Sequence, residues 1–140
     1  MYKIQIKNVL LAEDDEEDVL LFKTVVSELN QDIKIDVATD GTELMKILQQ
    51  VSTLPEVIFL DLNMPHKNGF ECLREIKSNE KWNSIKIVIL STSSQPQQIE
   101  TAYKCGADLY LAKPVSYTHF KNLLEKGISL NWEDLKQTVF

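Results

Sequence analysis

Cysteine is scarce in this sequence: only Cys72 and Cys105 are present, far apart and each within a stretch of helical periodicity. No disulfide framework or cysteine-based metal site is therefore predicted, and we expect both thiols to be reduced and packed. Long apolar runs are also missing, since none approaches the ~20 residues of a membrane helix and residues 1–8 lack the apolar core of a signal peptide. These absences predict a cytoplasmic protein that makes no membrane contact.

Basic residues are the second scarce feature. The chain has 15 Lys and Arg residues against 21 Asp and Glu residues, a net charge of −6, and no basic stripe. Nucleic-acid binding depends on clustered Lys and Arg, so we expect no nucleic-acid partner. With 140 residues, 44% of them hydrophobic, and no repeat or low-complexity tract, the chain fits one globular domain.

What the sequence does contain is a regular alternation of short apolar runs with stretches of helical periodicity. The run at 57–60 is apolar at every position, which is typical of a strand covered on both faces in a parallel sheet. Residues 33–37 instead alternate with period two, which indicates a strand at an edge or buried on one face. Further strands are predicted at 8–12, 85–90 and 108–112, and helical patterns occupy 16–29, 44–51, 69–78, 96–105 and 117–128.

Strands and helices in this order predict an α/β fold, a three-layer, doubly wound sandwich around a five-stranded parallel sheet, because each parallel connection needs a covering, right-handed crossover. The carboxyl ends of all strands then share one edge, which is where ligands collect in such folds. The side chains that follow the apolar runs at that edge are acids, a hydroxyl and an ammonium: Glu13, Asp14, Asp61, Ser91 and Lys113.

This set of side chains suits the transfer of a phosphoryl group. Three neighbouring carboxylates repel one another when all are ionised, unless a cation binds among them. A set of ligands made only of oxygens favours Mg²⁺ over zinc or copper. With Mg²⁺ beside Asp61 and Lys113 opposite, the charge spread over a transferring phosphoryl group would be neutralised. Asp61 is then the candidate nucleophile, which would form an aspartyl phosphate, and Ser91 could hydrogen-bond one of its oxygens.

Four motifs occur in a fixed order around these residues: Leu-Leu-Ala-Glu-Asp-Asp at 10–15, Asp-Leu-Asn-Met-Pro at 61–65 followed by Asn-Gly, Ser-Thr-Ser at 91–93 and Lys-Pro at 113–114. In order and spacing they resemble the receiver domain of two-component response regulators, near the single-domain chemotaxis type and the phytochrome-associated type. The resemblance covers about residues 8–128 and implies a flavodoxin-like fold with strand order 2-1-3-4-5. We assign residues 1–128 to a receiver domain and residues 129–140 to a tail, with a short helix in the tail as one option.

Matched by position, the resemblance implies that Asp61 is the phosphoacceptor and that Lys113 is one of its catalytic partners. The implied Mg²⁺ ligands are Glu13, Asp14, Asp61 and the backbone carbonyl of Asn63. The protein would then be a signalling domain rather than an enzyme for other substrates, and it would catalyse its own phosphorylation and its own slow dephosphorylation.

Ser91 is implied both as a catalytic residue and, together with Tyr110, as the conformational switch. An aromatic residue on an edge strand is usually packing, so that alternative stays open for Tyr110. The family's Lys-Pro bond, here Lys113–Pro114, is typically cis. Because His66 and His119 have no partners at metal-ligand spacing, the donor histidine is expected on another protein, a histidine kinase or a histidine phosphotransfer protein.

Two other function classes stay open. An aspartate-nucleophile phosphohydrolase usually has a second acid two residues after the nucleophile, where this chain has Asn63. A flavodoxin-like cofactor binder needs a phosphate-cradling loop after the first strand, where this chain has acids.

The segment after Lys113 is too short for an output domain, so we expect a downstream protein target, with a homodimer through the tail as a hypothesis. We interpret Glu16, Glu17 and Asp18 as a solvated, acidic helix start.

Overall fold

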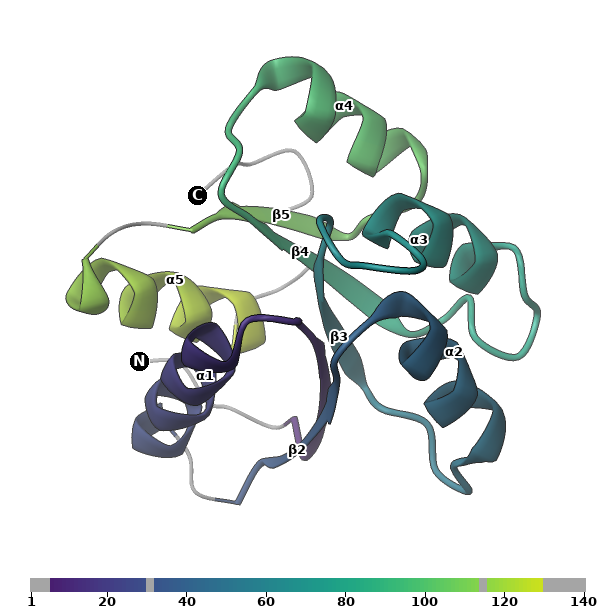
Figure 1. Cartoon of the computed structure of the whole chain (residues 1–140). Coiled ribbons are helices and arrows are strands. Elements are labelled where there is room, and N and C mark those ends of the chain that lie inside the picture. Colours follow the sequence, from purple (N-terminus) through teal and green to yellow (C-terminus); the bar gives the residue numbers. More distant parts are fainter. Residues whose placement is uncertain (1–5, 30–31, 114–115, 130–140) are drawn as a thin grey trace.

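Five parallel strands and five helices alternate along the part of the chain that the computed structural model describes, residues 6–29, 32–113 and 116–129 (Figure 1). The strands lie in the order β2-β1-β3-β4-β5 and every neighbouring pair is parallel, which confirms the predicted fold and strand order. In chain order the elements are β1 (Asn8–Ala12), α1 (Glu16–Leu29), β2 (Lys34–Ala38), α2 (Gly41–Gln50), β3 (Val57–Asp61), α3 (Gly69–Lys77), β4 (Lys86–Ser91), α4 (Pro96–Lys104), β5 (Leu109–Ala112) and α5 (Tyr117–Ser129).

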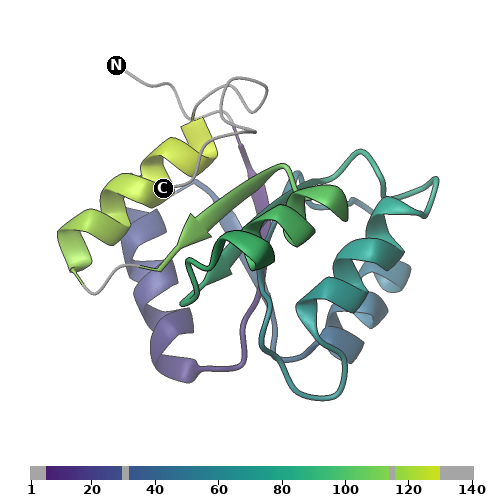
Figure 2. The same cartoon turned by 90° about the horizontal axis from the view of Figure 1, so that it is seen from above.

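The sheet lies between two layers of helices, with α1 and α5 on one face and α2, α3 and α4 on the other (Figure 1 and Figure 2). Ile58 and Leu60 of β3 pack toward α2 and α3, whereas Val57 and Phe59 pack toward α1 and α5. This follows because successive side chains of a strand point to opposite faces. All five residues of β3 are buried, which confirms the prediction of a strand covered on both faces.

The helix ends follow the capping residues of the sequence. The side chain of Asp40 caps α2, and Asn68 caps α3 in a capping box with Glu71. Pro96 is the first residue of α4, and Gly106, just past the end of that helix, has a φ of 107° that favours glycine. These local signals fix where each crossover leaves and re-enters the sheet.

Most of the differing boundaries are shifted from the prediction by one residue, and α2 begins at Gly41 rather than at residue 44. Ser91 is the last residue of β4 rather than the first residue after it. Val51 lies beyond α2, because its backbone is extended, with φ −73° and ψ 143°. Asp108 lies just before β5, where its carboxylate accepts hydrogen bonds from the backbone N–H of Ile87 and from Lys77 Nζ, at 2.9 Å and 3.0 Å.

Two predictions concern residues outside the described ranges: the cis bond before Pro114 and the helix in residues 130–140. Ser129, which was assigned to the tail, is the last residue of α5. Cys72 and Cys105 are free thiols, as expected. None of the helices in the described part of the chain combines the length and the apolar character that a membrane crossing requires.

Candidate functional site

The carboxyl ends of β1 and β3 bring the first two acids together. Ala12 of β1 is paired with Leu60 of β3 in the parallel register. The next residue along the chain is an acid in both cases, Glu13 after Ala12 and Asp61 after Leu60, so the two carboxylates lie side by side where the strands end. This is also where the strand order reverses, since β1 lies between β2 and β3, and such switch points are where open α/β sheets bind ligands.

The same register continues across the sheet and brings in the hydroxyl and the ammonium. Asp61 is paired with Leu90, so Ser91 stands one step further along β4. Ser91 is paired in turn with Ala112 of β5, and the residue after Ala112 is Lys113. The backbone N–H of Lys113 donates to the carbonyl of Ser91 at 2.7 Å, which anchors the lysine at the edge of the sheet.

Three carboxylates form a compact oxygen cluster at this edge. Glu13, Asp14 and Asp61 each offer one oxygen, and these atoms all lie within 4.8 Å of one another. Glu13 and Asp61 are buried, with 3% and 8% of their surface exposed, whereas Asp14 is exposed. Oxygens of this kind and spacing, reachable from one exposed side, suit a hard divalent cation that keeps some of its waters.

Asp15 follows Glu13 and Asp14 in the chain but does not belong to the carboxylate cluster. Its Oδ1 accepts hydrogen bonds from the backbone N–H groups of Glu17, at 2.8 Å, and Asp18, at 3.2 Å. Asp15 therefore caps the first turn of α1, as acids at this position commonly do. This agrees with the set of Mg²⁺ ligands implied by the resemblance, which contains Glu13 and Asp14 but not Asp15.

Lys113 supplies the positive charge of the site. Its side chain is 13% exposed, and Nζ lies 2.5 Å from Glu13 Oε1, 3.1 Å from Asp18 Oδ2 and 3.8 Å from Asp61 Oδ2. Burial lowers the pKa of Lys113, but the hydrogen bond to Glu13 and the charge of Asp61 outweigh it and raise that pKa. The contact with Asp18 was missed from the sequence, where Asp18 was interpreted as a solvated acid.

Ser91, Ser93 and Tyr110 form a chain of hydrogen bonds beside the carboxylates. Ser91 is fully buried, and its Oγ accepts a hydrogen bond from the backbone N–H of Ser93 at 3.1 Å. The hydroxyl of Tyr110, which is also fully buried, donates to the carbonyl of Ser93 at 2.7 Å. Both residues of the predicted switch are thus joined through one residue of the β4–α4 loop, and the Tyr110 ring is part of the core.

The loop after β3 is tied to Asp61 by its own backbone. The N–H of Asn63 donates to Asp61 Oδ1 at 3.1 Å. Asn63 is thereby held beside the acidic cluster, in the region from which its carbonyl was predicted to reach a metal. The other Asp61 oxygen, Oδ2, faces Lys113.

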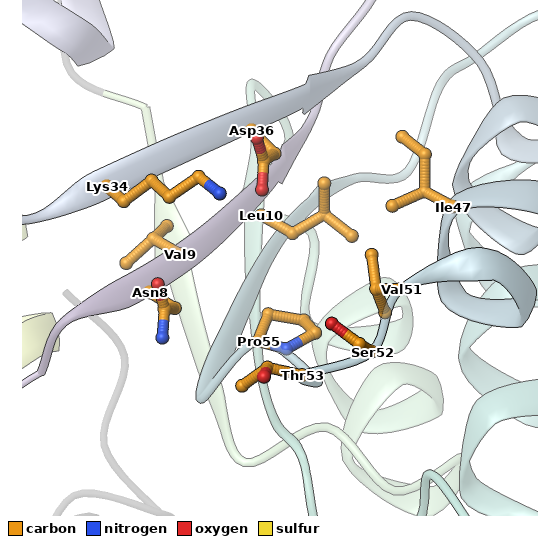
Figure 3. A pocket seen from close by; sticks show the side chains of 10 residues that line it. All are labelled: Asn8, Val9, Leu10, Lys34, Asp36, Ile47, Val51, Ser52, Thr53 and Pro55. Atoms are coloured by element: carbon orange, nitrogen blue, oxygen red, sulfur yellow. The ribbon is translucent and has the colours of Figure 1, made fainter.

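A hollow of about 380 Å³ lies at the opposite edge of the sheet (Figure 3). Asn8 and Lys34, the first residues of β1 and β2, line it together with residues of the segment after α2. Figure 3 shows Leu10 between Lys34 and Asp36 of β2 on its left and Ile47 of α2 on its right. This hollow is separate from the oxygen cluster, which sits where the strands end.

The pKa of Glu13 is raised, and this affects cation binding. Burial, and next the neighbouring Asp61 carboxylate, raise the pKa of Glu13 from 4.5 to about 7, although the Lys113 ammonium lowers it. The folded state therefore binds this proton more tightly than the unfolded chain does. In the metal-free protein, ionisation of Glu13 costs stability as the pH rises from 4.5 to about 7.

Cation binding should release the Glu13 proton, because a cation binds the ionised carboxylate. We expect the affinity for Mg²⁺, used as the probe, to rise with pH up to about pH 7 and to level off above it. Titration calorimetry in buffers of different ionisation enthalpy measures the proton release directly. Glu13→Gln should abolish that release, whereas the exposed control Glu17→Gln should keep it; an affinity independent of pH in the wild type would contradict the expectation.

A family model for the response regulator receiver domain matches residues 9–125 of the chain. The chain belongs to this family. The family match and the fold both identify the chain as a receiver domain, which confirms the resemblance inferred from the motifs.

Individual relatives agree with this assignment. The receiver is 36% identical over 131 residues to the response regulator Rcp1 of Synechocystis sp., a match that covers 90% of this chain and 88% of Rcp1. Its structure is similar to the Mn²⁺-bound form of Rcp1, with a TM-score of 0.80, 32% identity, and coverage of 96% of this chain and 97% of that one. It is also similar to the phosphorylated cyanobacterial phytochrome response regulator RcpA, with a TM-score of 0.81, 29% identity, and coverage of 88% and 94%.

Proposed function

We propose that this receiver accepts a phosphoryl group on Asp61 from a phosphohistidine of a partner kinase or phosphotransfer protein, and that the modified form binds a downstream protein. The observation that carries the proposal is the position of Asp61: a buried carboxylate within 4.8 Å of two others and 3.8 Å from the Lys113 ammonium. Fixed charges of both signs around one carboxylate are what phosphoryl transfer requires of a protein.

The metal in this proposal is Mg²⁺, held by Glu13, Asp14, Asp61 and the backbone carbonyl of Asn63. The oxygen cluster fits it, and the similar regulator Rcp1 has a Mn²⁺-bound structure. When bound, Mg²⁺ supplies the positive charge that offsets the carboxylates and the incoming phosphoryl oxygens.

In the transfer step, a carboxylate oxygen of Asp61 attacks phosphorus. The new P–O bond forms while the P–N bond of the donor phosphohistidine breaks and the imidazole leaves. Lys113 offsets the charge that spreads over the phosphoryl oxygens. Ser91 donates its hydroxyl hydrogen to one of them while its oxygen still accepts from Ser93, since a hydroxyl can do both.

The switch in this proposal runs from Ser91 to Tyr110. A shift of Ser91 toward the phosphoryl group pulls on Ser93, whose carbonyl holds the Tyr110 hydroxyl at 2.7 Å. Tyr110 already lies inside in this structure, so phosphorylation would stabilise an arrangement that the protein can already adopt. The surface formed by α4, β5 and α5 is where we propose that the change is sensed.

Slow hydrolysis of the aspartyl phosphate by the receiver itself is part of the proposal. An aspartate-nucleophile phosphohydrolase is not favoured, because the family is that of the receivers and Asn63 stands where the second acid would be. The division into a receiver of residues 1–128 and a tail of residues 129–140, the homodimer through that tail and the cytoplasmic location stay predictions.

The proposal is tested by mapping the modified residue. The protein is incubated with acetyl phosphate with and without Mg²⁺ and then treated with borohydride, which reduces an aspartyl phosphate to homoserine. We expect mass spectrometry to find homoserine at position 61 in the Mg²⁺ sample and almost none without the metal. Reduction at another acid, or none in either sample, would refute the assignment.

A further inference from the structure

Asp18 contacts the lysine of the phosphorylation site from outside the acidic cluster. It lies in the first turn of α1, and its Oδ2 accepts a hydrogen bond from Lys113 Nζ at 3.1 Å. A second hydrogen bond of the same ammonium goes to Glu13 Oε1 at 2.5 Å. Asp61 Oδ2, at 3.8 Å, is beyond hydrogen-bond distance. In this state the ammonium is therefore held by its two neighbours and not by the phosphoacceptor.

The position of Asp18 is fixed by the start of α1. The Asp15 carboxylate caps the helix by accepting from the backbone N–H of Asp18 at 3.2 Å. The Asp18 side chain is 42% exposed, whereas that of Lys113 is 13% exposed, so the ion pair bridges the buried site and the solvent. Removing Asp18 takes away one partner of Lys113 without opening the core.

The lysine has room to move between its partners. A small cavity of about 50 Å³ lies beside it, between the sheet and the α1–α5 layer. Two acids, Lys113 itself and apolar side chains line this cavity: Glu13, Asp18, Lys113, Leu11, Leu21, Phe22, Leu90 and Phe120. Among the side chains that line this cavity, only those of Glu13 and Asp18 can accept a hydrogen bond from the ammonium.

We propose that Asp18 is a positioning residue that holds the Lys113 ammonium toward α1 and thereby restrains it from the phosphoryl group on Asp61. The inference rests on the function proposed above. A phosphoryl group on Asp61 adds negative charge on the Asp61 side, so the ammonium must weaken its bond to Asp18 in order to donate to a phosphoryl oxygen. Asp18 thus favours the unphosphorylated state and acts through Lys113, without touching the reacting atoms.

The test compares four proteins: the wild type, Asp18→Asn, Asp18→Glu and Glu17→Gln. Glu17→Gln is the matched control, because it removes one negative charge from the same turn of α1 at an exposed position. The measured quantities are the initial rate of phosphorylation by acetyl phosphate at saturating Mg²⁺ and the affinity for beryllium trifluoride, a phosphoryl analogue.

We expect Asp18→Asn to raise both quantities by roughly two- to fivefold, the range that a partly exposed ion pair provides. Asp18→Glu should stay near the wild type because it keeps the charge within reach of Lys113, and Glu17→Gln should change less than Asp18→Asn. A lower phosphorylation rate in Asp18→Asn would overturn the inference, because it would mean that Asp18 assists the reaction. An equal rise of the rate in Glu17→Gln would also overturn it, because it would mean that only net charge matters.

A second readout does not depend on phosphorylation. The ¹H–¹⁵N signal of the Lys113 ammonium reports how firmly its hydrogens are held, and we expect faster hydrogen exchange in Asp18→Asn but not in Glu17→Gln. If the wild type takes no phosphoryl group, the proposed function fails while this spectrum still measures the Asp18–Lys113 bond. If the wild type is phosphorylated and Asp18→Asn matches Glu17→Gln in rate and spectrum, only the inference fails.

Discussion

Asp61→Asn is expected to lower the rate of phosphorylation by acetyl phosphate by at least about a thousandfold, because a carboxamide oxygen is a poor nucleophile. The substitution also removes one negative charge from the metal site. Mass spectrometry of the intact protein after incubation with acetyl phosphate and Mg²⁺ measures the loss. Labelling of Asp61→Asn at the wild-type rate would exclude Asp61 as the phosphoacceptor.

The fold should survive this substitution. Asparagine fills nearly the same volume, and its side-chain oxygen can still accept the hydrogen bond from the backbone N–H of Asn63. The neighbouring Glu13 should also ionise more readily, since Asp61 is one cause of its raised pKa. Thermal unfolding is therefore expected to show equal or higher stability, so a loss of labelling reports chemistry and not unfolding.

Asp15→Asn is the matched control for this experiment. It also converts an acid near the site to an amide, and asparagine is as good a helix cap as aspartate. Because Asp15 caps α1 and does not belong to the oxygen cluster, the variant should be labelled at a rate close to that of the wild type. A large loss in Asp15→Asn would mean that net charge alone governs the reaction.

The sheet and the order of its elements could be predicted from the sequence because burial on two faces leaves a strong pattern. β3 is apolar at every position that precedes Asp61, and only a central strand of a covered sheet tolerates that. The edge strand β2 shows the opposite pattern, alternating exposed and half-buried residues before Ala38. Since strand ends in such a sheet share one edge, the residues that follow them could be grouped before any distance was known.

The contacts of Lys113 could not be predicted in the same way. Its bond to Asp18 joins residues 95 positions apart and depends on how α1 packs against α5 and the sheet, which no local periodicity encodes. An acid in the first turn of a helix is explained equally well by the helix dipole, so the pattern gave no reason to single out Asp18. The raised pKa of Glu13 likewise arises from burial and from Asp61, both of which are consequences of tertiary packing.

Gly69→Ala is expected to destabilise the protein by about 3 kcal/mol or more, at the high end of what overpacking costs. A Cβ on Gly69 would lie 2.5 Å from the carbonyl oxygen of Asp61 and 2.6 Å from the Cα of Leu62. Both are backbone atoms, so no side-chain rotation relieves the contact. The N–H of Gly69 also donates to the Leu62 carbonyl at 3.0 Å, which binds the start of α3 tightly to the end of β3.

The contact between Gly69 and the end of β3 also links the stability of the protein to the chemistry of the site. To admit a methyl group, α3 must move away from β3 or the backbone of Asp61 must shift, and either change displaces the carboxylate from its neighbours. Urea unfolding should therefore show the loss of stability, and the rate of phosphorylation should fall under conditions where the variant is still folded. Gln97→Ala, at an exposed position of α4, is the control and should be neutral or slightly stabilising, because alanine is the best helix former. Wild-type stability in Gly69→Ala would show that the close approach of α3 to β3 is not a constraint, and that the position of Asp61 is set by the sheet alone.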